Sequence, residues 1–303
     1  MASLKIIRKR IISTKATQKI TRAMKMVAGA RLTRAQQRIT ALRPYAVKTA
    51  EILQSVAATI GGEGAASGDD VLHPLLTRRE EKKVLFVVMS SDRGLCGGFN
   101  TTINKATERA WREKERGGAE VRFATIGKKG REYLVRRKAD IAHDFQRIYD
   151  GLDLEKARTV AHWLAAGFEK AEFDAVYVVY NQFKSAMTQE LTIERLLPLE
   201  EPVATKTNDA KDAGVASTEF IFEPNQRALL QQLVPMYIEI SIYRALLESQ
   251  ASEFGARMTA MDAATRNAKD MIARLTLVYN RARQAAITKE LTEIIGGAEA
   301  LKE

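Results

Sequence analysis

The sequence predicts an α/β fold joined to a long antiparallel α-helical coiled coil. The N- and C-terminal helices form the coiled coil, and a central Rossmann-like α/β domain lies between them. Three observations predict this architecture. Apolar residues recur every seven positions through the last third of the chain, and a second helical pattern fills the first 58 residues. Between the two, short continuous apolar runs alternate with helical stretches, as in sheets whose parallel strands are buried on both faces.

These patterns divide the chain into four expected segments. Residues 60–70 are small, polar and rich in glycine, which is typical of a flexible linker. The expected segments are an N-terminal coiled-coil helix at 1–58, a linker at 59–81, an α/β base domain at 82–222, and a C-terminal coiled-coil helix with its tip at 223–303.

The N-terminal segment is expected to be one long helix, because its apolar residues recur at helical spacing. Pro44 should kink this helix or leave one backbone hydrogen bond unmade. The apolar positions are Leu4, Ile7, Ile11, Ile20, Met24, Val27, Ala28, Leu32, Ala35, Ile39 and Leu42.

Every charged residue of this helix before Glu51 is basic. Solvated helices usually mix the two signs, because like charges one turn apart repel. A helix with one sign of charge is therefore expected to face a negatively charged partner. The cations are Lys5, Arg8, Lys9, Arg10, Lys15, Lys19, Arg22, Lys25, Arg31, Arg34, Arg38, Arg43 and Lys48.

In the central segment the apolar runs predict strands, and the stretches between them predict helices. Alternation of the two predicts a sheet of parallel type. The expected strands are 84–89, 121–126, 141–145 and 173–180, with edge strands at 187–197 and 219–222. The expected helices are 101–116, 128–137 and 153–170.

The first strand of this domain is followed by a glycine-containing loop, Ser90–Asn100, where α/β folds often bind phosphate. Its glycine spacing matches neither the dinucleotide fingerprint nor a P-loop, and Gly127-Lys128-Lys129-Gly130 fails the same tests. We expect these glycines to permit tight turns and close packing. Cys96 has no histidine near it in sequence and is expected to be a buried structural thiol.

The last segment has the longest heptad pattern. A seven-residue apolar repeat held this long indicates a helix that supercoils with a partner. At 1.5 Å per residue it would be about 105 Å long, more than the diameter of an ordinary domain. One row is apolar throughout: Leu233, Ile240, Leu247, Phe254, Met261, Ala268, Leu275 and Ala282. A looser row starts at Tyr237 and ends at Ala286, and a third holds Met236, Tyr243, Ala264, Met271, Val278 and Ala285.

The first helix runs toward the α/β domain and the last helix runs away from it, so the two can pair only in antiparallel orientation. The last helix is longer than the first by about fifteen residues, so its end should project more than ~20 Å beyond its partner. This projecting end is slim and rich in alanine, but Leu291, Ile294 and Ile295 are too apolar to lie free in water.

Composition narrows the function. The net charge of +11 and the isoelectric point near 9.7 favour an acidic partner. A single cysteine excludes an internal disulfide, and three dispersed histidines make a zinc site improbable. No catalytic residues, no cofactor site and no metal site are apparent. No apolar run approaches the roughly 20 residues of a membrane span, and no secretory signal precedes the first helix.

Three stretches resemble the γ subunits of F-type ATP synthases, of bacterial type. They are residues 15–28 (KATQKITRAMKMVA), residues 91–100 (SDRGLCGGFN), and residues 279–294, which include Tyr279-Asn280-Arg281-Ala282-Arg283-Gln284-Ala285 and Ile287-Thr288-Lys289-Glu290-Leu291-Thr292-Glu293-Ile294. The resemblance covers nearly the whole chain. The third stretch is the most specific, because it lies at the end of a long heptad helix.

The resemblance implies a central rotor shaft without an active site of its own. Proton flow through a membrane ring would turn the shaft within a catalytic head of three α and three β subunits. The base would join the ε subunit and the c-ring, without nucleic acid, and would meet the membrane only through that ring. The expected location is the cytoplasmic face of a bacterial inner membrane, as a peripheral protein. A helical pattern starting directly after Met1 favours a bacterial member.

By the same resemblance, a set of polar side chains is expected to contact the β subunit. The basic surface near Lys25 and Arg31 would face an acidic β segment, and the projecting end would contact a β loop. The members of this second group are Arg283, Gln284, Thr288, Glu290 and Glu293.

Two alternatives stay open. The basic N-terminal helix also suits a coiled-coil nucleic-acid-binding protein, although few aromatic residues interleave with its cations. An α/β enzyme using the Gly94–Gly98 loop is the other alternative. The family resemblance favours the rotor.

Overall fold

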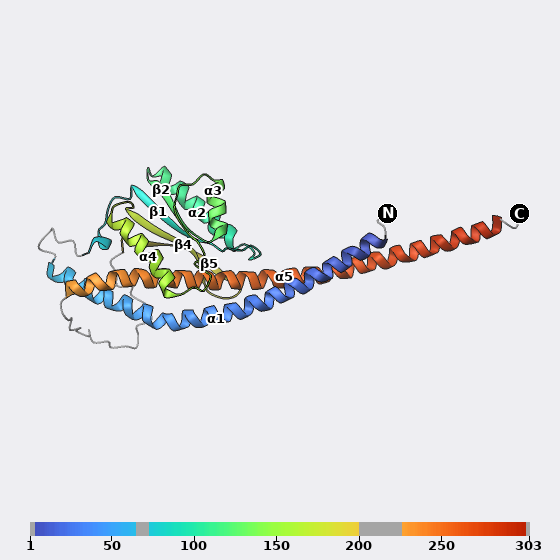
Figure 1. The fold of residues 1–303 in the computed structure, drawn as a ribbon, viewed down its shortest axis with the longest axis horizontal. Helices are drawn as coiled ribbons and strands as arrows, with labels where there is room; N and C mark the ends of the chain where they lie inside the picture. The colour runs from blue at the N-terminus through green and yellow to red at the C-terminus, as the bar shows by residue number, and fades with distance from the viewer. Residues whose placement is uncertain (1–3, 65–72, 200–225, 301–303) are drawn as a thin grey trace, which may run out of the picture. The chain divides into compact units, whose positions relative to one another are not determined.

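The computed structural model describes residues 4–64, 73–199 and 226–300. The long helices are α1 (Leu4–Gly64) and α5 (Gln226–Ala300), and a five-stranded sheet lies between them in sequence. The chain divides into two compact units. One comprises Met1–Ala30 with Arg257–Glu303, and the other comprises Arg31–Ala256. Each unit contains a part of α1 and a part of α5 (Figure 1).

The sheet of the second unit has the strand order β3-β2-β1-β4-β5. Its strands are β1 (Lys83–Met89), β2 (Glu120–Ile126), β3 (Ile141–Phe145), β4 (Ala175–Phe183) and β5 (Gln189–Leu197). The first four are parallel, which confirms the Rossmann-like prediction. β5 is antiparallel to β4, because the short connection between them is a hairpin and not a crossover. The strand predicted at Glu219–Phe222 lies outside the described residues.

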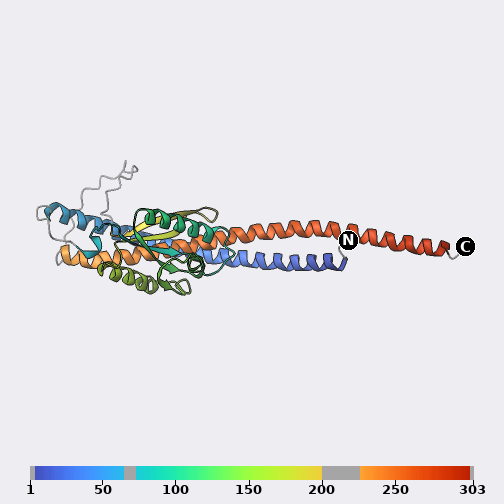
Figure 2. The same cartoon turned by 90° about the horizontal axis from the view of Figure 1, so that it is seen from above.

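Helices cover both faces of the sheet, so β1 is buried along nearly its whole length. On one face, α2 (Phe99–Arg116) and α3 (Lys128–Arg136) pack Ile103 and Leu134 against Phe86 and Phe123. On the other face, α4 (Leu154–Glu169) and the Arg31–Ala256 part of α5 bury leucine and valine side chains against the opposite side of the strands. Figure 2 shows the same layers from above.

The predicted boundary between the N-terminal helix and the linker, after residue 58, was wrong. α1 continues to Gly64, six residues beyond the expected end at 58, and a short 3₁₀ helix (Pro74–Leu76) lies inside the expected linker. Each glycine costs an established helix only about 1 kcal/mol, which does not end it. Pro44 and Pro235 also lie inside α1 and α5 without ending them. The other domain boundaries remain predictions.

The main heptad row of α5 faces inward, as expected. Its eight positions from Leu233 to Ala282 are buried or half-buried, and so are those of the looser row from Tyr237 to Ala286. The third row was assigned to the seam wrongly in its outer part, because Met271 and Val278 are more than half exposed. Along a coiled-coil helix, the positions that face the partner lie alternately three and four residues apart. In α5 the inward position after each main-row residue is four residues later, which is the looser row and not the third row.

The seam of α1 alternates the same steps, through Leu4, Ile7, Ile11, Thr14, Gln18, Thr21, Lys25 and Ala28 in the first unit. Ile20 and Val27 belong to the apolar pattern of the sequence, but they are 60% and 54% exposed. Each lies one residue before a buried seam position, Thr21 or Ala28, and one residue rotates a helical side chain by about 100°. Tertiary pairing therefore placed a threonine, and not the neighbouring isoleucine, in the seam.

Candidate partner-binding surfaces

The outer surface of α1 is basic and partly apolar. In the Met1–Ala30 part, Arg8, Lys9, Lys15 and other cations are exposed, and they alternate with exposed apolar side chains. These apolar side chains are Ile6, Ile12, Ile20, Met26 and Val27. A surface that combines cations with exposed aliphatic groups suits an acidic, amphipathic protein partner.

Lys25 lies at the edge of this surface and is bound within the chain. Its Nζ donates to Asp262 Oδ1 at 2.5 Å, and Arg266 lies 3.1 Å from the other oxygen of that carboxylate. The hydrogen bond from Lys25 lowers the pKa of Asp262. Sequence reasoning missed Asp262, whose signal was its place directly after the seam residue Met261. That position could be linked to Lys25 only once the antiparallel register of α1 and α5 was known.

The Lys25–Asp262 pair allows the two roles of Lys25 to be separated. Asp262→Lys should weaken the first unit, because it sets three cations together, and Lys25→Asp with Asp262→Lys should restore its thermal stability. If Lys25 also contacts an acidic partner, the restored variant will stay defective in proton pumping per ATP. Full recovery of pumping would show that Lys25 acts only within the chain.

The same pair predicts a pH dependence. The folded-state pKa of Asp262 is lowered, so its stabilising contribution is present above the ordinary carboxyl pKa. It is lost as pH falls through the lowered value, and the Asp262→Asn variant should lack this component in thermal melts.

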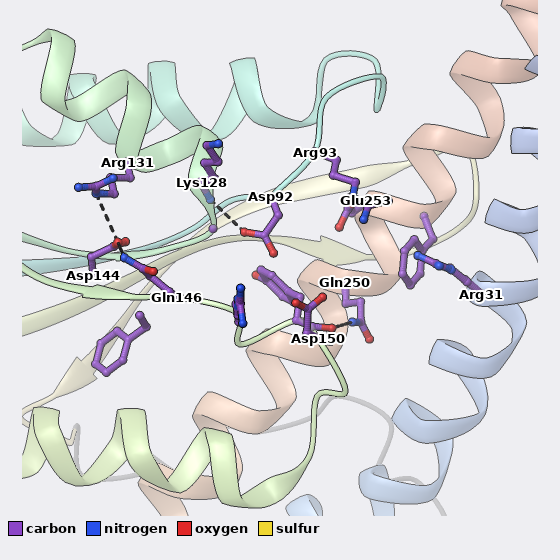
Figure 3. A pocket seen from close by; sticks show the side chains of 15 residues that line it. Arg31, Asp92, Arg93, Lys128, Arg131, Asp144, Gln146, Asp150, Gln250 and Glu253 are labelled. Carbon is purple, nitrogen blue, oxygen red and sulfur yellow. Dashed lines mark hydrogen bonds and ion pairs between the residues drawn. The ribbon is translucent and has the colours of Figure 1, made fainter.

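Arg31 belongs to the Arg31–Ala256 unit, where it lies over the Phe254 ring at 5.9 Å. Both side chains line a cavity of about 510 Å³ at the carboxyl ends of β1, β2 and β3. Figure 3 shows Arg31 and Glu253 at one side of this cavity and Arg131 with Asp144 at the other. Positive and negative side chains are nearly balanced around it, so the cavity shows no strong preference for an anion.

The N-terminus of α3 is capped by the loop that follows β1. The amide of Lys128 donates to Asp92 Oδ1 at 3.1 Å, that of Lys129 to the Ser91 carbonyl, and that of Gly130 to Ser90 Oγ. These are the first amides of α3, which would otherwise bind an anion. The expectation of close packing is confirmed for Gly127, where an added Cβ would lie 2.2 Å from the Ser90 carbonyl oxygen, and for Gly130. It is not confirmed for Gly94, where an added Cβ would have no atom within 4 Å.

Cys96 is buried, as expected for a structural thiol. Asn100 Nδ2 donates to its sulfur at 3.2 Å, and the Asn100 side chain also bonds to Ser91. The loop from Ser91 to Asn100 is thus held by its own polar side chains.

The far end of α5 is exposed in the chain alone. Lys25 lies opposite Asp262, and Thr21 lies opposite Thr265. This register places Leu4, the first residue of α1, opposite about residue 282. About 17 residues at the end of α5 therefore have no partner in α1, which is a helix length of roughly 25 Å. Figures 1 and 2 show this end projecting past the start of α1. Its exposed apolar residues are Ile287, Leu291, Ile294 and Ile295, about half to two-thirds exposed.

The predicted contact residues of this end share its outer surface. All are exposed, and Glu293 pairs with Lys289 at 3.4 Å. They are Arg283, Gln284, Thr288, Glu290 and Glu293. They lie in the first unit together with Lys25, whereas Arg31 lies in the second.

Within residues 4–64, 73–199 and 226–300, no helix is long and apolar enough to cross a membrane. In the same part of the chain, no three His, Cys, Asp or Glu side chains gather where they would hold a metal ion.

Comparison with known proteins gives consistent matches. The family model described as ATP synthase matches residues 3–301. The ATP synthase gamma chain of Sorangium cellulosum is 55% identical, covering 100% of both chains. The Euglena gracilis mitochondrial ATP synthase rotor covers 94% of this chain and 98% of its own at 18% identity, with a TM-score of 0.61. A chain of its OSCP/F1/c-ring assembly covers 98% and 94% at 19% identity, with a TM-score of 0.65.

Proposed function

Because the chain belongs to the family of ATP synthase gamma chains, we propose that it is the central rotor shaft of an F-type ATP synthase. It couples proton flow through a membrane ring to ATP synthesis or hydrolysis in a catalytic head by rotating. The observation that carries this proposal is the end of α5, which has no partner in α1 and exposes apolar side chains. Such a helix end needs other chains around it.

The two-helix construction suits the transmission of torque. Two paired helices resist bending and twisting more than one helix does, and the polar contacts Lys25–Asp262 and Thr21–Thr265 hold their register within the first unit. The shaft turns within three α and three β subunits, while the α/β domain joins ε and the c-ring.

Contacts with the β subunits use two groups of side chains. Lys25 and Arg31 on α1 face an acidic segment, and exposed Arg31 offers a cation stacked on Phe254. The second group is at the end of α5: Arg283, Gln284, Thr288, Glu290 and Glu293. Ile287, Leu291 and Ile294 supply apolar contact beside them.

The shaft has no catalytic site of its own. The capped N-terminus of α3 supports this part of the proposal, because its first three amides donate to Asp92, Ser91 and Ser90 and are not free to bind a phosphate. The location that fits is the cytoplasmic face of a bacterial inner membrane, as a peripheral subunit. Nucleic-acid binding is not supported, since the whole chain matches gamma chains.

Reconstitution tests the proposal. The purified chain alone should hydrolyse no ATP, and adding it to matching α and β subunits should yield a complex with sustained ATPase turnover. A mixture of α and β without the chain is the control. Equal turnover with and without the chain would contradict the rotor function.

A further inference from the structure

We propose that residues 73–79, the latch segment, form an acid-sensitive latch on the α/β domain, and that protonation of His73 opens it. The latch segment lies between α1 and β1 in the chain and wholly within the Arg31–Ala256 unit. It contains the 3₁₀ helix Pro74–Leu76 and is separate from the proposed β-contact residues.

Three contacts hold the latch segment on the domain. The side chain of Leu75 is fully buried in the same core cluster as the apolar side chains of α4. The Leu75 carbonyl oxygen accepts from the Leu199 amide at 3.4 Å. Arg79 Nη1 donates to the Phe168 carbonyl oxygen of α4 at 2.9 Å, and its guanidinium lies 5.0 Å from the centre of the Phe168 ring. The latch segment therefore joins the chain after β5 to the end of α4.

His73 closes the turn at the start of the latch segment. It is the N-cap of the 3₁₀ helix, and its Nδ1 accepts a hydrogen bond from the Leu75 amide at 3.1 Å. Its own carbonyl oxygen accepts from the Leu76 amide at 3.0 Å. An Nδ1 that accepts a hydrogen bond carries no proton, so the ring is neutral with its proton on Nε2. The residue is 7% exposed, so water cannot readily replace this bond.

Protonation reverses the role of Nδ1. In a charged imidazole both ring nitrogens are donors, so Nδ1 would face the Leu75 amide, which is also a donor. A buried cation beside an amide that has lost its acceptor is unfavourable. The protonated residue therefore favours an open latch segment, in which water surrounds the ring and the amide. Opening of this kind is a local unfolding that leaves the rest of the domain folded.

The charged groups around His73 lie on α4 and on the latch segment itself. The Glu169 carboxylate, at the end of α4, favours the protonated ring, but burial outweighs it and lowers the pKa of His73. On the latch segment, Arg79 is bound to Phe168 and Arg78 is exposed.

The sign of the pH dependence follows from this lowered pKa. Once the latch segment opens, His73 is in water and regains its ordinary pKa of 6.5. The closed form therefore has its full stability above the ordinary pKa and loses it as pH falls through that value. The loss levels off below the lowered pKa of the closed form.

The test measures hydrogen–deuterium exchange of the purified full-length chain by mass spectrometry, in peptides that cover residues 73–79. Rates are divided by the intrinsic exchange rate at each pH, and the amides of Leu75, Leu76 and Thr77 report opening. From pH 7.5 to pH 5.5 we expect opening to increase severalfold. The increase should not exceed about tenfold, because pH 5.5 is one unit below the ordinary pKa.

His73→Asn is the variant that isolates the titration. Asparagine is among the best N-cap residues and can accept from the Leu75 amide, but it does not titrate. Protection at pH 7.5 should therefore be kept and should become independent of pH. His162→Asn replaces a histidine of α4 whose side chain is 69% exposed, and it should keep the response of the unmodified chain.

Glu169→Gln gives a second reading if His73→Asn does not close. It removes the carboxylate that favours the charged ring, so the acid response should move to lower pH. Unchanged opening of the unmodified chain between pH 7.5 and pH 5.5 would overturn the proposal, and so would an equal response in His73→Asn or a lost response in His162→Asn. An acid response that stays in place or moves to higher pH in Glu169→Gln would also overturn it. The measurement needs no other subunit, so its failure leaves the rotor function untouched.

Discussion

Oxidation of the Thr21→Cys/Thr265→Cys variant is expected to link α1 covalently to α5 in nearly every molecule. The Oγ1 atoms of Thr21 and Thr265 are 2.9 Å apart, so cysteines at these positions can meet with little backbone movement. Both residues lie in the Met1–Ala30 and Arg257–Glu303 unit. The single native cysteine is buried and does not compete.

The link closes a loop of most of the chain, which would stabilise the folded state by about 5 kcal/mol if unfolded-chain entropy dominates. Non-reducing electrophoresis measures its formation, and thermal melts with and without reductant measure the stabilisation. ATP-driven proton pumping should persist in the assembled enzyme, because both helices turn together as one shaft.

Thr17→Cys/Thr265→Cys is the matched control, since Thr17 is exposed and lies one turn from Thr21. It should form little intramolecular link. Equal linking in both variants would contradict the register, and lost pumping in the linked Thr21 variant would mean that the helices must move against each other.

Gly127→Ala is expected to destabilise the α/β domain by about 3–5 kcal/mol. Gly127 has a φ of 97°, a conformation that side chains disfavour, and an added Cβ would lie 2.2 Å from the carbonyl oxygen of Ser90. That oxygen belongs to the backbone at the end of β1 and cannot move without disturbing the first turn of α3. Urea unfolding followed by the fluorescence of Trp111 and Trp163 measures the change, because both tryptophans lie in this domain.

Gly118→Ala is the control that separates backbone strain from the steric clash with Ser90. Gly118 also has a positive φ, 83°, but nothing lies within 4 Å of its added Cβ. Its replacement should cost only about 1 kcal/mol, from the left-handed backbone alone. Equal losses for the two variants would mean that contact with Ser90 is unimportant.

Sequence reasoning located the base domain's strands and helices to within a few residues, as with the helix expected at 153–170 and found at Leu154–Glu169. It also identified the main seam row and the projecting end of α5. These features depend on the spacing of apolar residues within one segment. The direction of β5 and the end of α1 at Gly64 depended on connections and packing that spacing does not encode.

The candidate site divides in the same way. The exposed set from Arg283 to Glu293 and the basic surface of α1 could be read from composition and resemblance. The partnership of Lys25 with Asp262 could not, because it joins residues 237 positions apart through an exact register of two helices. Asp92 at the first turn of α3 also appears only when distant segments meet.

The sequence by itself determined that two long helices flank an α/β domain, that the C-terminal helix extends beyond the N-terminal one, and that the N-terminal helix has a basic surface. Helical and strand periods are local properties, so the chain order alone contains them. Only the tertiary structure decided that Thr21 and not Ile20 enters the seam, and that Asp92 caps the first turn of α3. Those choices follow from packing all neighbours at once, which no single segment specifies.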